Sequence, residues 1–223
     1  MTLSRIAAIA AGLGVTLTLN SAQAAFVLTL DDLSTGGIDV TVTDDGAGDS
    51  YPGLGTMTFL GPVGSFNVNV TTGVSKPQLT GGVMDLNSIN ISGGAGGTLV
   101  IGLTDTGFTG SFPAYTANYG GTTTGTVDFD FWHDPNDAQF GGGTILPAAP
   151  ISVGPGAFSG SSTNPIAPGT PYSLSIFATI NHGEGSQNTS FDAELRPVPI
   201  PPAVWLFGSG LLGLAGVARR RRA

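Results

Sequence analysis

Residues 172–181 read Tyr-Ser-Leu-Ser-Ile-Phe-Ala-Thr-Ile-Asn. Apolar side chains recur at every second position, so an extended strand here would turn one face toward a core. The same period of two recurs at 38–43 and 65–70, where Ile, Val and Phe alternate with Asp, Thr, Ser and Asn. A period of two in several separate runs predicts antiparallel strands with one buried and one wet face.

Further strands are predicted outward from these runs, at 26–30, 56–60, 84–91, 98–104, 126–132 and 190–195. Turn signals rich in glycine separate them, at 34–37, 44–48, 93–97 and 120–121. About nine short strands and no long helical pattern predict an all-β fold. We expect a single antiparallel β-sandwich, and a jelly roll is the alternative that sequence does not separate from it.

Residues 141–171 are less regular, because they contain six prolines among glycines and serines. Proline does not donate to a sheet ladder, so a long loop or edge connection is predicted there. The regular run at 172–181 follows and needs the same core, so no domain boundary is placed in this region. Residues 25–197 are therefore expected to form one exported domain, and with no cysteine in the chain it has no disulfides.

The N-terminus has the features of a signal peptide. Met1 to Arg5 is short and positive, 6–19 is apolar and small, and Ala22-Gln23-Ala24 places small residues where a signal peptidase cleaves. Residues 1–24 are thus predicted to be removed, with Ala25 as the mature start. A retained anchor is the alternative.

The C-terminal segment, 198–223, combines three features in order. A proline-rich motif comes first, then sixteen uncharged residues at 203–218, then an arginine cluster; the motif is Val198, Pro199, Ile200, Pro201 and Pro202, and the cluster is Arg219, Arg220, Arg221 and Arg222. Sixteen helical residues span about 24 Å, close to a hydrocarbon core of about 30 Å. A transmembrane helix with a cytoplasmic arginine stop is predicted, since guanidinium groups cross lipid at high cost. An ordinary membrane anchor or a buried apolar helix is the alternative.

This segment resembles the C-terminal sorting signal of PEP-CTERM proteins, in its VPLPA-CTERM variant. Ile200 stands where that variant has leucine, and Pro202 where it has alanine. The resemblance implies export, transient anchoring in the inner membrane, and processing by an exosortase-like enzyme. It further implies release to the cell surface or extracellular matrix, in association with exopolysaccharide or biofilm.

The charge balance of the exported part is strongly acidic. Between Ala25 and Pro197 the sequence has fifteen acidic residues and two basic ones, Lys76 and Arg196, which gives a net formal charge of −13. Such a charge argues against nucleic acid or anionic lipid as a partner. It favours solubility or cation binding.

One acidic cluster suggests a calcium site. Its members lie on a predicted strand and the turn after it: Asp128, Asp130, Asp134, Asn136 and Asp137. Calcium takes six to eight oxygen ligands, which this cluster could supply in part. A solvated strand face followed by an ordinary Asp-Pro-Asn-Asp turn is the alternative. Asp44, Asp45 and Asp49 form a weaker candidate.

Signals for catalysis are weak. The two histidines, His133 and His182, have no nucleophile elbow or metal-protease motif around them, and His182 is expected in a surface loop. An aromatic sugar-binding surface is a further hypothesis, set against core packing of the same side chains: Trp132, Phe140, Tyr115 and Tyr119. A structural or adhesive matrix protein is favoured, ahead of a carbohydrate- or calcium-binding module and of an exported hydrolase.

Overall fold

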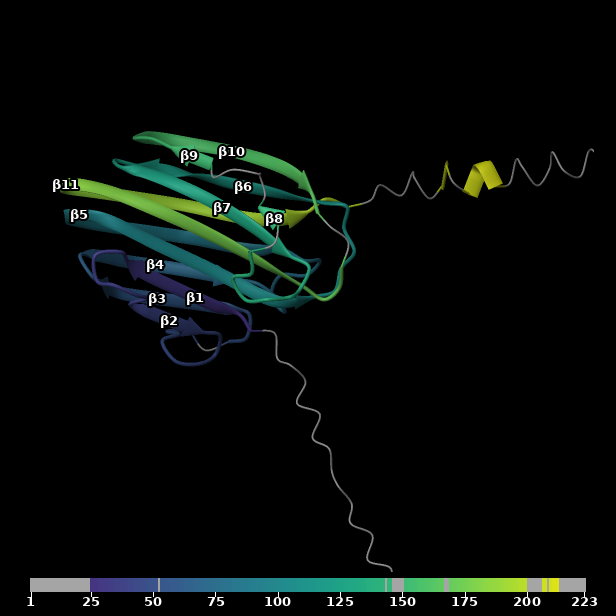
Figure 1. Cartoon of the computed structure of the whole chain (residues 1–223), viewed down its shortest axis with the longest axis horizontal. Coiled ribbons are helices and arrows are strands. Elements are labelled where there is room, and N and C mark those ends of the chain that lie inside the picture. The colour runs from purple at the N-terminus through teal and green to yellow at the C-terminus, as the bar shows by residue number, and fades with distance from the viewer. Residues whose placement is uncertain are drawn as a thin grey trace, which may run out of the picture.

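The computed structural model describes residues 25–51, 53–142, 144–145, 151–166, 169–199, 206–207 and 209–212. Every strand pairing in it is antiparallel, which confirms the predicted all-β antiparallel class (Figure 1). The strands are β1 (Val27–Asp32), β2 (Val40–Thr43), β3 (Thr56–Val63), β4 (Phe66–Val74), β5 (Met84–Phe108), β6 (Ala114–Thr123), β7 (Thr126–Asp134), β8 (Thr144–Ile145), β9 (Ile151–Val153), β10 (Gly156–Pro165) and β11 (Tyr172–Pro197).

Two long strands, β5 and β11, pair with each other along nearly their whole length and take part in two layers. Layer 1 has the order β3-β4-β5-β11-β6-β10 and uses the first half of β5 with the second half of β11. Layer 2 has the order β2-β1-β5-β11-β7, with β8 and β9 beyond β7, and uses the other two halves. The two layers agree with the predicted sandwich and with its jelly-roll alternative.

Glycines mark the place where the β5–β11 pair passes from one layer to the other. Gly96, Gly97 and Gly185 have φ values of 75°, 137° and 96°, which favour glycine over any other residue. The register of the pair also shifts between Glu184 and Gln187. The run 93–97, predicted as a turn between two strands, is therefore a bend within one strand.

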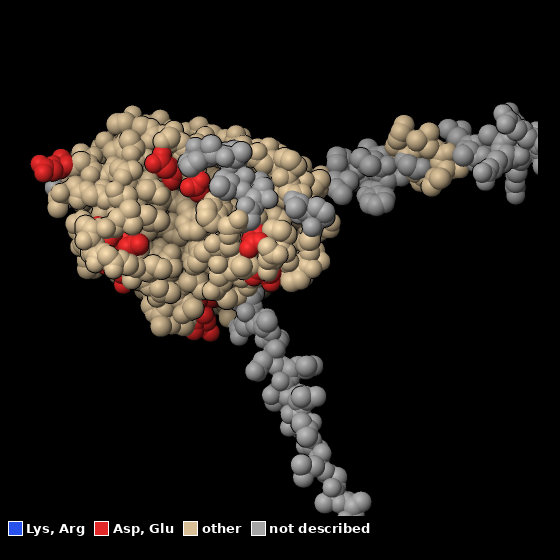
Figure 2. Space-filling model, in the orientation of Figure 1, with Lys and Arg blue, Asp and Glu red and all other residues tan. Residues whose placement is uncertain are grey.

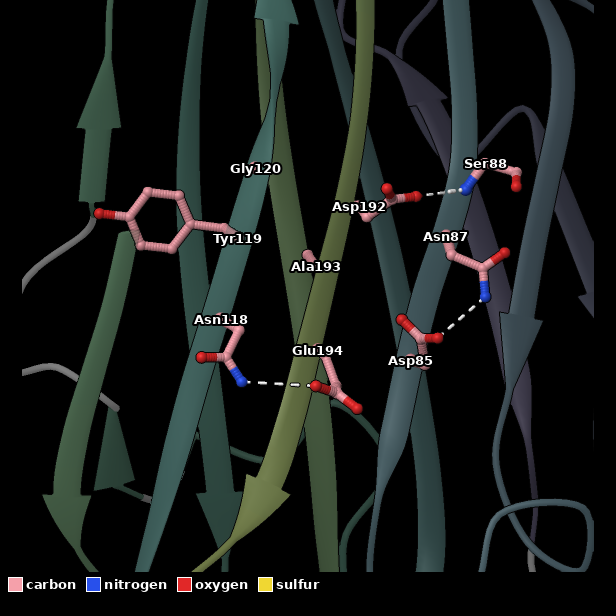
Figure 3. Close-up of a pocket in the computed structure, with 9 residues that line it drawn as sticks. All are labelled: Asp85, Asn87, Ser88, Asn118, Tyr119, Gly120, Asp192, Ala193 and Glu194. Atoms are coloured by element: carbon pink, nitrogen blue, oxygen red, sulfur yellow. Dashed lines mark hydrogen bonds between the residues drawn. The ribbon is translucent and has the colours of Figure 1, made fainter. Parts of the chain in front are cut away.

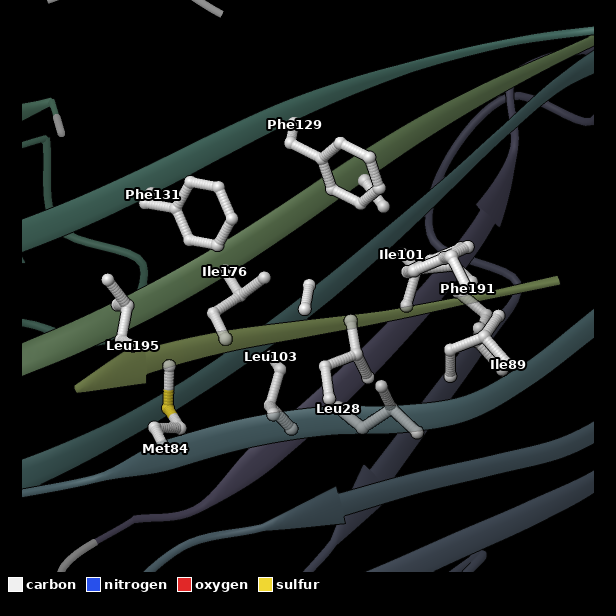
Figure 4. Close-up of a cluster of buried hydrophobic side chains, with 14 of the residues drawn as sticks. Leu28, Met84, Ile89, Ile101, Leu103, Phe129, Phe131, Ile176, Phe191 and Leu195 are labelled. Carbon is white, nitrogen blue, oxygen red and sulfur yellow. The ribbon is translucent and has the colours of Figure 1, made fainter. Parts of the chain in front are cut away.

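The core lies between the two layers. Phe191 of layer 1 meets Phe129 of layer 2 edge-on, with ring centroids 5.2 Å apart. The hydroxyls of Tyr115 and Tyr172, one from each layer, lie 2.8 Å apart. Figure 4 shows side chains of both layers meeting in this core, among them Leu28, Leu103 and Ile176 of layer 2 and Met84, Ile89 and Leu195 of layer 1.

The prediction of a long loop at 141–171 is wrong in part. Residues 144–145 and 151–153 form β8 and β9, and 156–165 form the ten-residue strand β10. Strand β6 was also not predicted. Strand β10 is rich in glycine and serine and has little apolar alternation. In β6 the alternation is short, because it ends at Gly120 and Gly121, which were predicted as a turn and instead lie within the strand.

The two targeting segments fall largely outside the described residues. Residues 1–24, with Ala22 and Ala24, lie wholly outside, as do Ile200, Pro201, Pro202 and the four arginines. Of the predicted apolar helix, 206–207 and 209–212 are described and are helical. Among described residues, no helix has the length and apolarity that crossing a membrane requires.

Candidate functional site

A hollow of about 430 Å³ lies on the outer face of layer 1, across strands β5, β11 and β6 (Figure 3). Carboxylate and amide side chains dominate its lining: Asp85, Asn87, Asn118, Asp192 and Glu194, with Ser88, Gly120, Ala193 and Tyr119. Only Tyr119 supplies an aromatic ring to this lining, and Figure 3 shows that ring pointing away from the three carboxylates. The hollow is thus a polar one.

The alternation of each strand explains why these groups gather. On β11, Phe191, Ala193 and Leu195 point into the core, so Asp192 and Glu194 point outward. The pairing register sets Glu194 between Asp85 of β5 and Asn118 of β6. Three strands that are far apart in the sequence therefore bring their polar faces to one row.

Hydrogen bonds hold each carboxylate in place. The Ser88 amide donates to Asp192 Oδ1 at 2.8 Å, and Asn87 Nδ2 donates to Asp85 Oδ2 at 2.9 Å. Asn118 Nδ2 donates to Glu194 Oε2 at 3.4 Å. The second oxygens of Asp85 and Asp192 make no hydrogen bond to the described residues, so they remain available as acceptors.

The hollow carries negative charge. Burial raises the pKa of Asp85; the hydrogen bond from Asn87 acts against this, and the nearby Glu194 and Asp192 raise the pKa further. Arg196 Nη2 binds Glu194 Oε1 at 2.6 Å from an exposed position beside the hollow. One guanidinium thus faces three carboxylates.

A second hollow of about 220 Å³ continues the first along the same strands. Amide and hydroxyl groups line it: Asn90, Ser92, Thr122, Asn188 and Ser190, with Ile91 and Thr189. Asn90 pairs with Ser190, and Ser92 with Asn188, so these outward side chains stand in neighbouring cross-strand rows. We call the residues lining the two hollows the polar trough.

Of the trough residues, only Tyr119 was named from the sequence as a candidate for sugar binding, and its polar neighbours were not. The available signal is the pair of runs Asp85-Leu86-Asn87 and Asp192-Ala193-Glu194, in which acids or amides alternate with buried apolar residues. Only the pairing of β5, β11 and β6 shows that these runs share a face.

The predicted calcium cluster is divided between several roles. Asp128 accepts a hydrogen bond from Ser152, and burial together with Asp128 raises the pKa of Asp130. Asp134 Oδ1 accepts from the Asn136 amide at 2.9 Å, as the turn alternative requires, and Asp137 Oδ1 accepts from the Gly107 amide at 2.6 Å. Within the described part of the chain, no three His, Cys, Asp or Glu side chains are grouped to hold a metal. Calcium binding stays a prediction without support from this placement.

Asp44 and Asp49, members of the weaker candidate, close the loop between β2 and β3. Both Asp44 oxygens accept from the Gly55 amide, at 2.8 and 2.9 Å. Asp49 Oδ1 accepts from the amides of Tyr51 and Thr58, each at 3.0 Å.

The predicted aromatic surface is assembled only in part. Trp132 and Phe140 both pack against Phe177, with centroid distances of 5.0 and 5.6 Å, on the outer face of layer 2. Phe177 was not among the predicted residues. Tyr115 is buried in the core, and Tyr119 packs on Phe129 at 5.4 Å, so these two follow the core alternative.

Both histidines are buried, and the expectation that His182 lies in a surface loop is wrong. His182 Nε2 lies 2.8 Å from Thr189 Oγ1, next to the bend between the layers. His133 packs against Tyr172 with a centroid distance of 4.9 Å. Burial lowers the pKa of each imidazole, so both are held neutral.

Comparison with known proteins finds no matching family model and no curated relative. Solved structures with some likeness include TmCBM61 in complex with β-1,4-galactotriose, at 8% identity, covering 62% of this chain and 92% of that one, with a TM-score of 0.33. A family 29 carbohydrate-binding module complexed with mannohexaose shows 12% identity, covers 77% of this chain and 92% of that one, and has a TM-score of 0.28. The enzymatically active domain of bacteriophage CBA120 tailspike protein 4 shows 10% identity, covers 58% of this chain and 19% of that one, and has a TM-score of 0.33. Likeness at this level carries no statement about function.

Proposed function

We propose that this protein binds polysaccharide through the polar trough. The observation that carries the proposal is the open row of carboxylate, amide and hydroxyl groups across β5, β11 and β6. Sugar hydroxyls both donate and accept hydrogen bonds. Carboxylates supply acceptors, and amides and serine or threonine hydroxyls supply both donors and acceptors.

Other ligand classes fit this surface less well. Small-molecule pockets are predominantly apolar and bury most of their ligand, whereas this trough is polar and open at the surface. Nucleic acid and anionic lipid would meet the three carboxylates with like charge. A long, neutral, hydroxyl-rich chain meets neither difficulty, and it can run along the two adjoining hollows.

We also propose that the chain is exported and sorted as the resemblance of its C-terminus implies. The support is in the sequence, in the A-x-A site at Ala22 and Ala24 and in the order of motif, apolar segment and arginines. A surface protein that holds polysaccharide would then act as an adhesive component of an extracellular matrix.

Affinity electrophoresis tests the binding proposal. The whole chain is run through gels containing a soluble glucan, galactan or mannan, and retardation by at least one of them is expected. Asp192→Asn with Glu194→Gln should weaken binding at least tenfold, since a hydrogen bond to a charged group contributes about 1.5–3 kcal/mol. The matched control is Asp128→Asn with Asp130→Asn, which makes the same charge change on layer 2. Equal weakening by both pairs, or no retardation in any gel, would contradict the proposal.

A further inference from the structure

Strand β10 forms a long edge of layer 1. Its ten residues pair with β6 without a register shift, from Gly156 opposite Thr123 to Pro165 opposite Ala114. Within the described residues, no strand pairs with its other side. Figure 1 shows β10 along the upper margin of the molecule. A strand in this position presents a row of unpaired backbone N–H and C=O groups.

The other edges of the two layers carry features that hinder pairing. At the opposite edge of layer 1, β3 has a register shift between Phe59 and Gly61 and a proline at Pro62. In layer 2 the edge strands are short, since β2 has four residues, β8 two and β9 three. Bulges, proline and short length are the usual protections of sheet edges. Strand β10 has none of them before its last residue, Pro165.

Charge also singles out this edge. Residues 138–183 contain no Asp, Glu, Lys or Arg, although the exported part carries −13. The face seen in Figure 2 shows acidic side chains at several places and no lysine or arginine. Four exposed side chains along β10 are small and neutral: Ala157, Ser159, Ser161 and Thr163. Two copies of an acidic molecule repel each other least where such a neutral strip faces its own copy.

We propose that the free edge of β10 pairs with β10 of a second copy of this chain. Antiparallel pairing about a two-fold axis satisfies the edge groups of both copies with one and the same surface. Layer 1 then continues from one molecule into the next. The outer face that carries the polar trough becomes part of a single sheet shared by two molecules.

Sedimentation tests the pairing. The whole chain, of 22.3 kDa, should shift from monomer to twice that mass as its concentration rises into the micromolar range. Ser159→Glu with Ser161→Glu places like charges along the paired edge of both copies and should raise the dissociation constant at least tenfold. The matched control, Thr41→Glu with Thr43→Glu, adds the same charge to exposed positions of the edge strand β2 and should leave the dimer intact. A monomeric wild type, a dimer that persists in the β10 variant, or a dimer lost in the control would each overturn the proposal.

A cysteine scan keeps the test decisive if charged variants fold poorly. The chain has no cysteine, so one introduced thiol crosslinks only to another copy. In a two-fold antiparallel pair, residues near the axis lie about 4.5–5.5 Å from their own copies, within disulfide range. Cysteine at 157, 159, 161 or 163 should therefore give one maximum of crosslinked dimer under mild oxidation, whereas cysteine at Thr41 should give little. Uniform crosslinking at all five positions would overturn the proposal.

Discussion

Asp32 joins the two layers through its carboxylate. It ends β1 in layer 2 and accepts hydrogen bonds from the Ser65 amide at 2.7 Å and the Ser65 hydroxyl at 2.9 Å, in the β3–β4 turn of layer 1. Ser34 adds two more, at 3.0 and 2.7 Å. Burial acts to raise the pKa of Asp32, but the four hydrogen bonds outweigh it and lower the pKa to about 2 from 3.8. A Cβ at Gly64 would lie 2.2 Å from Asp32 Oδ2, so the turn also requires glycine.

We predict that Asp32→Asn lowers the free energy of unfolding at pH 7 by about 2 kcal/mol, the equivalent of this pKa difference. The folded pKa is depressed, so the stability that Asp32 contributes is present above about pH 4 and is lost as the pH falls toward 2. Urea unfolding of both proteins between pH 7 and 2.5 should show the difference shrinking over that window. The exposed Glu184→Gln serves as the control. A difference that does not change with pH would exclude the hydrogen-bonded carboxylate as its cause.

Lys76 and Asp105 form a largely buried ion pair with Nζ and Oδ2 2.7 Å apart. The Ser75 hydroxyl adds a hydrogen bond to the same oxygen at 2.6 Å, and the ammonium lies 4.1 Å from the centre of the Phe108 ring. Burial raises the pKa of Asp105, although the hydrogen bonds from Lys76 and Ser75 act against it. Removing the lysine alone would therefore leave a buried carboxylate without its cation.

We predict that Lys76→Met lowers the free energy of unfolding by about 3–5 kcal/mol, and that Lys76→Met with Asp105→Leu recovers most of the loss. Arg196→Met, which breaks the exposed pair with Glu194, should cost less than about 1 kcal/mol. Chemical denaturation of the four proteins measures these differences. If Lys76→Met and Arg196→Met lower the free energy of unfolding equally, burial of the Lys76–Asp105 pair does not determine its contribution to stability.

At the scale of elements, the bend in the β5–β11 pair decides the architecture. Gly183 and Gly185 lie on the β11 side of this bend, and a Cβ on either would meet no atom within 4 Å. They differ in backbone conformation, since Gly185 has a φ of 96° and Gly183 is not in the positive region. Comparing substitutions at these two glycines therefore measures backbone strain, because neither position is sterically crowded and only Gly185 has a positive φ.

We predict that Gly185→Ala lowers the free energy of unfolding by about 1–2 kcal/mol, because a side chain strains the positive φ. Gly183→Ala should change it by less than about 0.5 kcal/mol, as exposed substitutions usually do. Thermal unfolding of the two variants gives the comparison. If both variants unfold at the same temperature as the wild type, the bend does not depend on a positive φ at residue 185.

At the scale of the whole molecule, the C-terminal tail leaves from the end of β11. The Val198 amide donates to the Ala114 carbonyl at 2.9 Å, so the sheet holds the chain up to the first residue of the proline-rich motif. Proline at 199 and 201 favours an extended backbone beyond that point. An extended backbone at this motif would leave it accessible to the processing enzyme that its resemblance implies.

We predict that this tail is cut near 198–202 after export. Mass spectrometry of the protein from its native host should find peptides up to Arg196 and none from Trp205 onward. Replacing Pro199 and Pro201 by alanine should leave the full-length form in the inner membrane. Mature surface protein that retains Leu206 to Arg219 would instead identify an ordinary anchor.

The sequence by itself determined the strand class and the inward face of most strands. In the run from Tyr172 to Ile180, alternate side chains had to be buried whatever the neighbouring strands were, because the side-chain period of a strand is two. The acidic balance was equally readable, since it depends on composition alone, and the roles of the two terminal segments stay predictions. Strand β10 was not predicted because its glycines and serines give little alternation, and β6 was not predicted because two glycines interrupt its short alternating run.

Only the tertiary structure decided which strands are neighbours. Residues 84–91 and 98–104 looked like two strands with a turn between them, and their pairing with β11 made them one strand shared by two layers. The same pairing placed Glu194 between Asp85 and Asn118 and so created the polar trough. Alternation decides which side of each strand faces inward. The outer row depends on pairings such as Glu194 with Asp85 and with Asn118, which are 109 and 76 positions apart, and no local pattern encodes such pairings.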